Sequence, residues 1–199
     1  MSPITHLFAG WVVADRTADG VRDCRLVTLA GLAPDLDGIG LVVDIVRNAV
    51  HHTQSFYYYQ VYHHSLLHGI PGALVVAGLA AALAKKSGRV FLLAMIALHL
   101  HLLCDLLGSR GPELGDLWPI FYLAPISNDP MWLWRGQWQL DGWQNRIITL
   151  GLMVWIMGRA LKRGESIVAI FSQRADLVFV ATLQKWRNDF VGRWRTLRS

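Results

Sequence analysis

Apolar residues fall into long runs that are separated by short polar, glycine- or proline-containing stretches. Runs of this length, almost without strand-like alternation, predict helices over residues 4–13, 72–84, 90–107 and 147–161. From Ser166 onward, apolar and basic residues recur at helical spacing. We therefore expect an all-α fold, a compact bundle of about six or seven helices that is partly embedded in a membrane. Residues 1–165 would form the helical domain and residues 166–199 a basic amphipathic C-terminal helix.

Residues 33–38 combine a proline with two aspartates, Asp35 and Asp37. Pro34 is expected to force Ala33 out of helical geometry, so that a new helix begins at the acidic pair. One of the aspartates would then serve as an N-cap. For both together, spaced at i and i+2 before an apolar run, the pattern favours metal ligands over caps.

Three histidines, His63, His64 and His68, stand within six residues just before the apolar helix at 72–84. His64 and His68 share a helical face, and His63 could reach the same point if the first turn is irregular. A lone histidine on an apolar face is usually a hydrogen-bonded core residue. A cluster of this density is more typical of a metal site, because neutral imidazole is the commonest metal ligand.

The apolar helix at 90–107 carries His101 and Asp105 four residues apart, on one face. A carboxylate in such a segment needs a hydrogen bond, an arginine or a metal ion, because an isolated buried charge is prohibitively costly. The short basic turn at 85–89 makes the helices before and after it antiparallel neighbours. The histidine cluster that begins the first helix should therefore meet His101 and Asp105 at the end of the second.

Hydrophobic residues make up 53% of the chain, and mean hydropathy is +0.33. The helices at 72–84 and 147–161 are short for a span, which needs about 20 residues. If they alternate with the helix at 90–107, the basic residues at 85–89 and 159–163 mark one side. The positive-inside rule puts that side in the cytoplasm and the His/Asp clusters toward the outer face. We expect membrane association, with spanning favoured over shallow embedding.

The remaining composition adds three points. Net charge is +5, and the excess lies mostly in the C-terminal tail, which is either a solvated helix packed on the domain or a basic helix on anionic lipid. Because these charges lie away from the candidate site, they argue against a nucleic-acid partner. Cys24 and Cys104 form neither a disulfide framework nor a thiolate zinc motif, and we expect no removable secretory signal. The tryptophan-rich loop at 108–141 fits a substrate mouth or a membrane-interface belt.

Five motifs occur in a familiar order: Thr5-His6-Leu7, Ala33-Pro34-Asp35-Leu36-Asp37, His63-His64-Ser65-Leu66-Leu67-His68-Gly69, His101-Leu102-Leu103-Cys104-Asp105 and Trp118-Pro119. With them, the chain resembles, over roughly residues 1–125, the bacterial membrane-bound metal-dependent hydrolases of the YdjM-like family. These are distant relatives of zinc-dependent phospholipase C and P1 nuclease. The resemblance implies a core like theirs and a matching set of metal ligands. The implied ligands are His6, Asp35, Asp37, His63, His68, His101 and Asp105. His64 stands where the family often has arginine, so His63 and His64 compete for one ligand position.

The resemblance implies metal-assisted hydrolysis of a phosphoester, with a lipid-borne substrate as the natural choice. Imidazole and carboxylate ligands suit zinc, or manganese or iron, and their number fits one ion or two ions about 3.5–4 Å apart. Asp35 or Asp37 would bridge the metals or act as the base. Arg110 would hold a phosphate, and Trp118 would contact substrate. The alternative is a non-catalytic membrane protein with a structural metal site or a buried His/Asp network. Either protein would lie in the bacterial inner (cytoplasmic) membrane.

Overall fold

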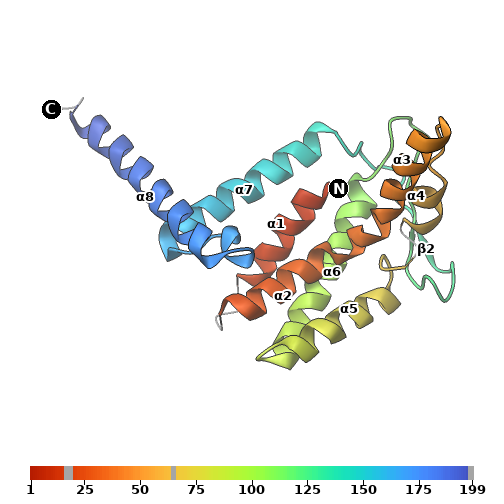
Figure 1. Ribbon diagram of the computed structural model, residues 1–199, viewed down its shortest axis with the longest axis horizontal. Helices are drawn as coiled ribbons and strands as arrows, with labels where there is room; N and C mark the ends of the chain where they lie inside the picture. Colours follow the sequence, from red (N-terminus) through yellow and green to blue (C-terminus); the bar gives the residue numbers. More distant parts are fainter. Residues whose placement is uncertain (16–19, 64–65, 197–199) are drawn as a thin grey trace.

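The computed structural model describes residues 1–15, 20–63 and 66–196, and helices dominate it (Figure 1). In chain order the elements are α1 (Pro3–Ala14), α2 (Val21–Leu32), the 3₁₀ helix η1 (Ala33–Ile39), α3 (Gly40–His51), α4 (Tyr57–Tyr62), α5 (Ile70–Leu83), α6 (Ser87–Gly108), β1 (Ile120–Phe121), β2 (Met131–Trp132), α7 (Trp143–Arg163), the 3₁₀ helix η2 (Ile167–Ile170) and α8 (Gln173–Thr196). The strands β1 and β2 form a small antiparallel pair within the loop region. The predicted all-α class is confirmed.

The centre of the bundle is packed with small side chains from α1, α2, α5 and α6. Seven alanines supply most of this core: Ala14, Ala30, Ala73, Ala77, Ala80, Ala94 and Ala97. The backbones of α1 and α2 approach most closely where Gly10 meets Gly31. A Cβ atom on Gly31 would lie 3.1 Å from the Gly10 Cα atom and 3.3 Å from the Ala97 Cβ atom. Small residues of this kind allow the close helix contacts typical of membrane bundles.

The path from α2 to α3 differs from the prediction. Ala33 keeps helical dihedral angles (φ −58°, ψ −34°), so Pro34 does not break the helix. The chain tightens instead into η1, where Pro34 occupies the first turn and its missing N–H group costs nothing. The bias of a residue before proline against helical geometry is overridden here. As a result, residues 21–51 form one helical path, and η1 carries Asp35 and Asp37 in its middle.

The predicted hairpin at 72–84 and 90–107 is observed as α5 and α6, each a few residues longer than expected at its start. The carboxylate of Asp23 on α2 accepts hydrogen bonds from the backbone N–H groups of Lys85 and Lys86 and so fixes the turn between them. At the other end of the hairpin, His68 lies against the end of α6. The expected meeting of the two clusters is confirmed.

Two helical segments are long and apolar enough to cross a membrane, Val21–His51 and Ser87–Gly108. Of the three helices predicted to span, α6 meets this criterion. α5 has 14 residues, and α7, with 21 residues, is not one of the two candidate segments. Large apolar side chains are exposed along α3, α5, α6 and α7. Exposure on this scale is typical of surfaces that face lipid.

The bundle has a basic end and a site end. At the C-terminal end of α1, Asp15 forms ion pairs with Arg159 and Arg163 of α7, at 2.6 and 3.0 Å. His6 lies more than two helical turns away, nearer the start of α1. The basic residues at 85–89 begin α6, whereas His101 and Asp105 stand near its end. Both basic groups thus lie at the end away from the histidines, as the alternating arrangement predicts.

The remaining segments follow the predicted outline. Residues 109–142 are largely irregular apart from β1 and β2. The C-terminal helix is observed as α8, which leaves the bundle in Figure 1. The division into two units near residue 165 stays a prediction.

Candidate metal centre

Five histidine and aspartate side chains from four parts of the chain meet at the site end. His6 comes from α1, Asp35 from η1 and His68 from the segment before α5, while α6 supplies His101 and Asp105. They fall into two groups whose candidate ligand atoms lie within 4.8 Å of one another: His6, His101 and Asp105, and Asp35, His68 and His101. Four of the five are buried, and Asp35 is partly accessible. Each group could hold a metal ion.

His101 is common to both groups and is rigidly oriented. Its Nδ1 atom donates to the backbone carbonyl of Gly31, 2.8 Å away, so Nε2 is the nitrogen with a lone pair. The ring stacks on that of His6, with centroids 3.7 Å apart. Its Nε2 atom lies 3.0 Å from Asp105 Oδ2, one turn further along α6, and 3.8 Å from Asp35 Oδ1. A backbone carbonyl on the far nitrogen is the usual way of orienting a ligating histidine.

Asp37 holds His68 in the same manner. Its Oδ2 atom accepts hydrogen bonds from the backbone N–H groups of Leu66 and Leu67, at 3.1 and 2.8 Å, and from His68 Nδ1 at 3.1 Å. These donors share one oxygen of the carboxylate, and Asp37 belongs to neither group of candidate ligands among the described residues. The structure thus gives Asp37 a contact that positions His68. The role of Asp37 as a ligand or catalytic residue stays a prediction.

Other buried aspartates show the same pairing with backbone. Asp44 accepts from the N–H groups of Tyr58 and Tyr59, and Asp23 accepts from two N–H groups in the turn before α6. Asp105 is different, because its ion pairs are with three histidines and the Met1 amino group. This contrast separates aspartates that fix the backbone from the one at the centre of the site.

The donor spacing fits a tetrahedral ion. His68 and His101 both donate through Nδ1, so their Nε2 lone pairs face each other at 3.3 Å and repel unless a proton or a metal ion lies between them. Asp105 Oδ2 completes a triangle, 3.0 Å from His101 Nε2 and 3.5 Å from His68 Nε2. Bonds of about 2.0–2.1 Å to a tetrahedral ion place neighbouring donors about 3.3–3.4 Å apart. The three distances bracket that value.

The two histidines of the 63–68 segment have different electrostatics. Burial lowers the pKa of His68, but the hydrogen bonds that His68 donates to the carboxylates of Asp105 and Asp37 outweigh it and leave the pKa above its ordinary value. Burial, and next the neighbouring His68, lower the pKa of His63 to about 4. His63 is therefore neutral near pH 7, while His68 lies in a strongly negative setting that favours a cation.

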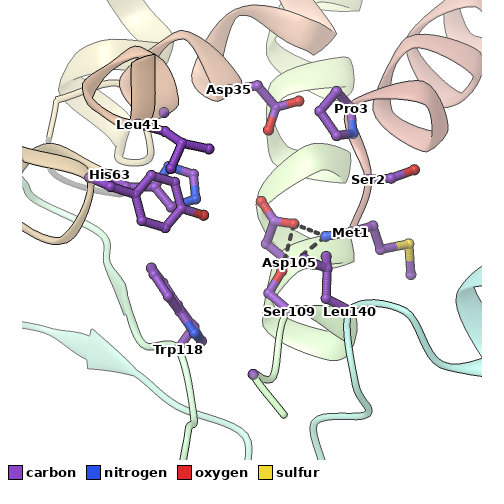
Figure 2. A pocket seen from close by; sticks show the side chains of 13 residues that line it. Met1, Ser2, Pro3, Asp35, Leu41, His63, Asp105, Ser109, Trp118 and Leu140 are labelled. Carbon is purple, nitrogen blue, oxygen red and sulfur yellow. Dashed lines mark hydrogen bonds and ion pairs between the residues drawn. The ribbon is translucent and has the colours of Figure 1, made fainter. Parts of the chain in front are cut away.

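The second oxygen of Asp105 faces away from His68. Its Oδ1 atom lies 3.1 Å from His6 Nε2, and it accepts hydrogen bonds from Ser109 Oγ at 2.8 Å and from the amino group of Met1 (Figure 2). The one carboxylate thus links both groups of histidines. Sequence reasoning missed Ser109, although its position four residues after Asp105 on the helix face could have revealed it.

A pocket of about 360 Å³ opens next to the donors. Asp35 and Asp105 reach toward it from one side, and His63 and Trp118 line the other (Figure 2). The ring of Tyr59, also missed from the sequence, stacks on His63 with centroids 4.5 Å apart. Two of the candidate ligands are therefore part of a pocket wall.

The other predicted site residues lie outside the two donor groups or outside the described residues. Trp118 lines the pocket, held by reciprocal hydrogen bonds between its backbone and the Gln137 amide. Arg110 is not among the residues that line the pocket, and its guanidinium donates to the carbonyls of Gln137 and Glu113 in the loop. Its phosphate role stays a prediction. His63 lies at the pocket wall rather than in either donor group, and His64 is outside the described residues.

Fold and site together define an all-helical membrane protein with a buried His/Asp cluster that could hold a metal ion. The family model described as YdjM inner membrane protein matches residues 1–174. The chain therefore belongs to this family, and its location is the inner membrane. Searches of curated proteins and of solved structures found no match.

Proposed function

We propose that the protein is a metal-dependent hydrolase of the membrane that acts on a phosphoester, with zinc as its metal. The observation that carries this proposal is that Asp35 and Asp105 belong both to the donor groups and to the pocket wall. A structural metal site is closed by protein ligands, whereas a catalytic site keeps a position open to water and substrate. The adjoining pocket supports the catalytic alternative.

The primary ion would be held by His68, His101 and Asp105, whose donor atoms have tetrahedral spacing. A second ion would share Asp105, because its Oδ1 atom faces His6 while Oδ2 faces the other histidines. His101 can ligate one ion at a time, since its Nδ1 atom is bound to Gly31. Imidazole and carboxylate donors suit zinc, and manganese or iron are the other candidates. When bound, such an ion lowers the pKa of water and stabilises charge on phosphoryl oxygens.

Asp35 is the best-placed base among the predicted residues. It lines the pocket, and its Oδ2 atom is buried without a hydrogen-bond partner within the described part of the chain. An oxygen in that state can accept the proton of an attacking water. His101 and Asp105 lie on the same side, so the proton acceptor and the ion-binding donors would act on one phosphoryl group.

A lipid-borne substrate fits the surroundings of the pocket. Its wall includes Leu41, Tyr59 and Trp118. Next to it, Leu36 and Ile39 of η1 are exposed to more than 60%. An apolar approach of this kind lets a lipid chain stay in the bilayer while its headgroup enters the pocket. The basic end of the bundle would face the cytoplasm and the pocket the outer face.

The test is hydrolysis by detergent-purified protein that has been stripped with chelator and reloaded with zinc or manganese. We expect release of product from bis-p-nitrophenyl phosphate or phospholipid only after reloading. Asp35→Asn should abolish turnover while it keeps the metal, and Asp44→Asn is the matched control with normal turnover. Folded, metal-loaded wild-type protein that hydrolyses no phosphoester in the panel would contradict the proposal and favour a non-catalytic structural site.

A further inference from the structure

The last helix, α8, lies almost entirely beyond the region matched by the family model, which ends at residue 174. Its first half is attached to the bundle. Val180 and Leu183 pack with Ala160 and Leu161 of α7. Asp176 accepts hydrogen bonds from the backbone N–H and the hydroxyl of Ser166, which fixes the start of the helix.

In the second half of α8, the same apolar face continues but is exposed. Leu183, Trp186 and Phe190 stand at i, i+3 and i+7, the spacing of one helical stripe. Leu183 is buried against α7, but Trp186 and Phe190 are 64% and 70% exposed. Asn188, two positions from both, lies on the opposite side of the helix. The stripe therefore extends past the end of its contact with the bundle.

The charge of α8 is strongly positive. Between Gln173 and Thr196 the chain has five basic residues and two acidic ones. Arg187 lies between Trp186 and Phe190 in sequence, and Arg193 follows three residues after Phe190. Aromatic side chains beside arginines are typical of helices that lie in the interface of a membrane with anionic lipid.

The position of α8 agrees with such a surface. It starts beyond the end of α7 where Arg159 and Arg163 pair with Asp15, away from the histidine cluster. In Figure 1, α8 runs crosswise to α7 as it leaves the bundle. The helix therefore extends sideways from the basic end of the bundle, where a membrane surface would lie.

We propose that α8 is an in-plane anchor that binds the anionic lipid surface of the cytoplasmic leaflet through Trp186, Phe190 and its basic residues. A second copy of the chain is the competing occupant for the stripe. Pairing two α8 helices would bring like charges together, whereas anionic headgroups neutralise them. Charge complementarity therefore selects lipid, and this inference is independent of hydrolysis.

The test uses the full-length chain with Cys24 and Cys104 replaced by alanine, reconstituted into vesicles of phosphatidylcholine with or without phosphatidylglycerol. A spin label is attached to Phe190→Cys or, as the matched control, to Asn188→Cys. Its accessibility to oxygen, which concentrates in lipid, is compared with accessibility to a water-soluble nickel complex. We expect the label at position 190 to favour oxygen in the anionic vesicles, while the label at 188 favours nickel. The difference should shrink in neutral vesicles and at high salt.

Three results would overturn the proposal. One is a label at position 190 that is equally accessible to nickel in both kinds of vesicle. Another is spin–spin broadening at 190 that disappears when labelled protein is diluted with unlabelled protein, which would identify a second copy as the occupant. The third is unchanged insertion in a K185Q/R187Q variant, because removing two charges should weaken binding to anionic lipid.

Discussion

Replacing Asp37 with asparagine tests whether this residue acts through His68. Asp37 Oδ2 accepts two backbone N–H groups and His68 Nδ1. An asparagine oxygen can still accept those donors but lacks the negative charge that orients the imidazole and makes it more basic. Loss of such a partner typically costs about 10–100-fold in metal affinity, about 1.4–2.7 kcal/mol. Because the acceptor remains, we expect Asp37→Asn near the lower limit and Asp37→Ala near the upper one.

The assay is a competition titration of chelator-stripped protein with a chromophoric zinc indicator, at fixed detergent concentration. Asp44→Asn is the matched control, because Asp44 also accepts two backbone N–H groups but has no histidine among the partners seen in the structure. Its zinc affinity should equal that of wild type, even if its thermal midpoint falls. Equal weakening by Asp37→Asn and Asp44→Asn would show that general loosening, not the hold on His68, lowers affinity and would refute the reasoning.

Three further predictions concern packing and the pocket. Gly31→Ala should lower the free energy of unfolding by about 1–3 kcal/mol, seen as a lower thermal midpoint, because its Cβ atom would press on Gly10 and Ala97. Gly78→Ala is the control and should not lower the midpoint, because the space around Gly78 is open. Equal thermal midpoints for the two variants would contradict the close contact between helices at Gly31. Trp118→Ala should raise KM for a phosphoester by about tenfold through the lost aromatic contact, without changing metal content. An unchanged KM would show that Trp118 does not contact the substrate. Arg110→Gln should leave kcat/KM unchanged, because the guanidinium donates its hydrogen bonds to loop carbonyls. A large loss of activity would instead support a role for Arg110 in binding phosphate.

The sequence predicted the site best where topology alone determined proximity. A short turn between two apolar helices makes them antiparallel. This placed His68 beside His101 and Asp105 before any contact was known, and the structure brings them within 3.5 Å. His6 joined this set through resemblance alone, because nothing in its own apolar surroundings indicates where α1 packs.

Local rules failed where tertiary structure overrides them. Pro34 indicated a helix break, but the turn tightens into η1 and the helical path continues. Asp35 and Asp37 look equivalent in sequence, yet on η1 one lines the pocket and the other turns to the backbone of Leu66 and Leu67. Which histidine nitrogen each aspartate meets depends on side-chain direction in a 3₁₀ helix, and spacing along the chain does not contain that information. Arg110 was assigned from its charge and its place just past the Asp105 helix, and the sequence did not show that its guanidinium donates to two loop carbonyls.

The most direct test of the metal centre is the metal content of folded, detergent-purified protein, measured by inductively coupled plasma mass spectrometry. Wild type should carry near-stoichiometric zinc or another divalent transition metal, and His101→Ala and Asp105→Asn should lose it. His99→Ala is the matched control on the same helix, because His99 instead hydrogen-bonds to the Met95 carbonyl and Tyr122. If His99→Ala is the one variant of the three that retains metal, the centre lies at His101 and Asp105. A folded wild-type protein that holds no metal after exposure to zinc would contradict the account.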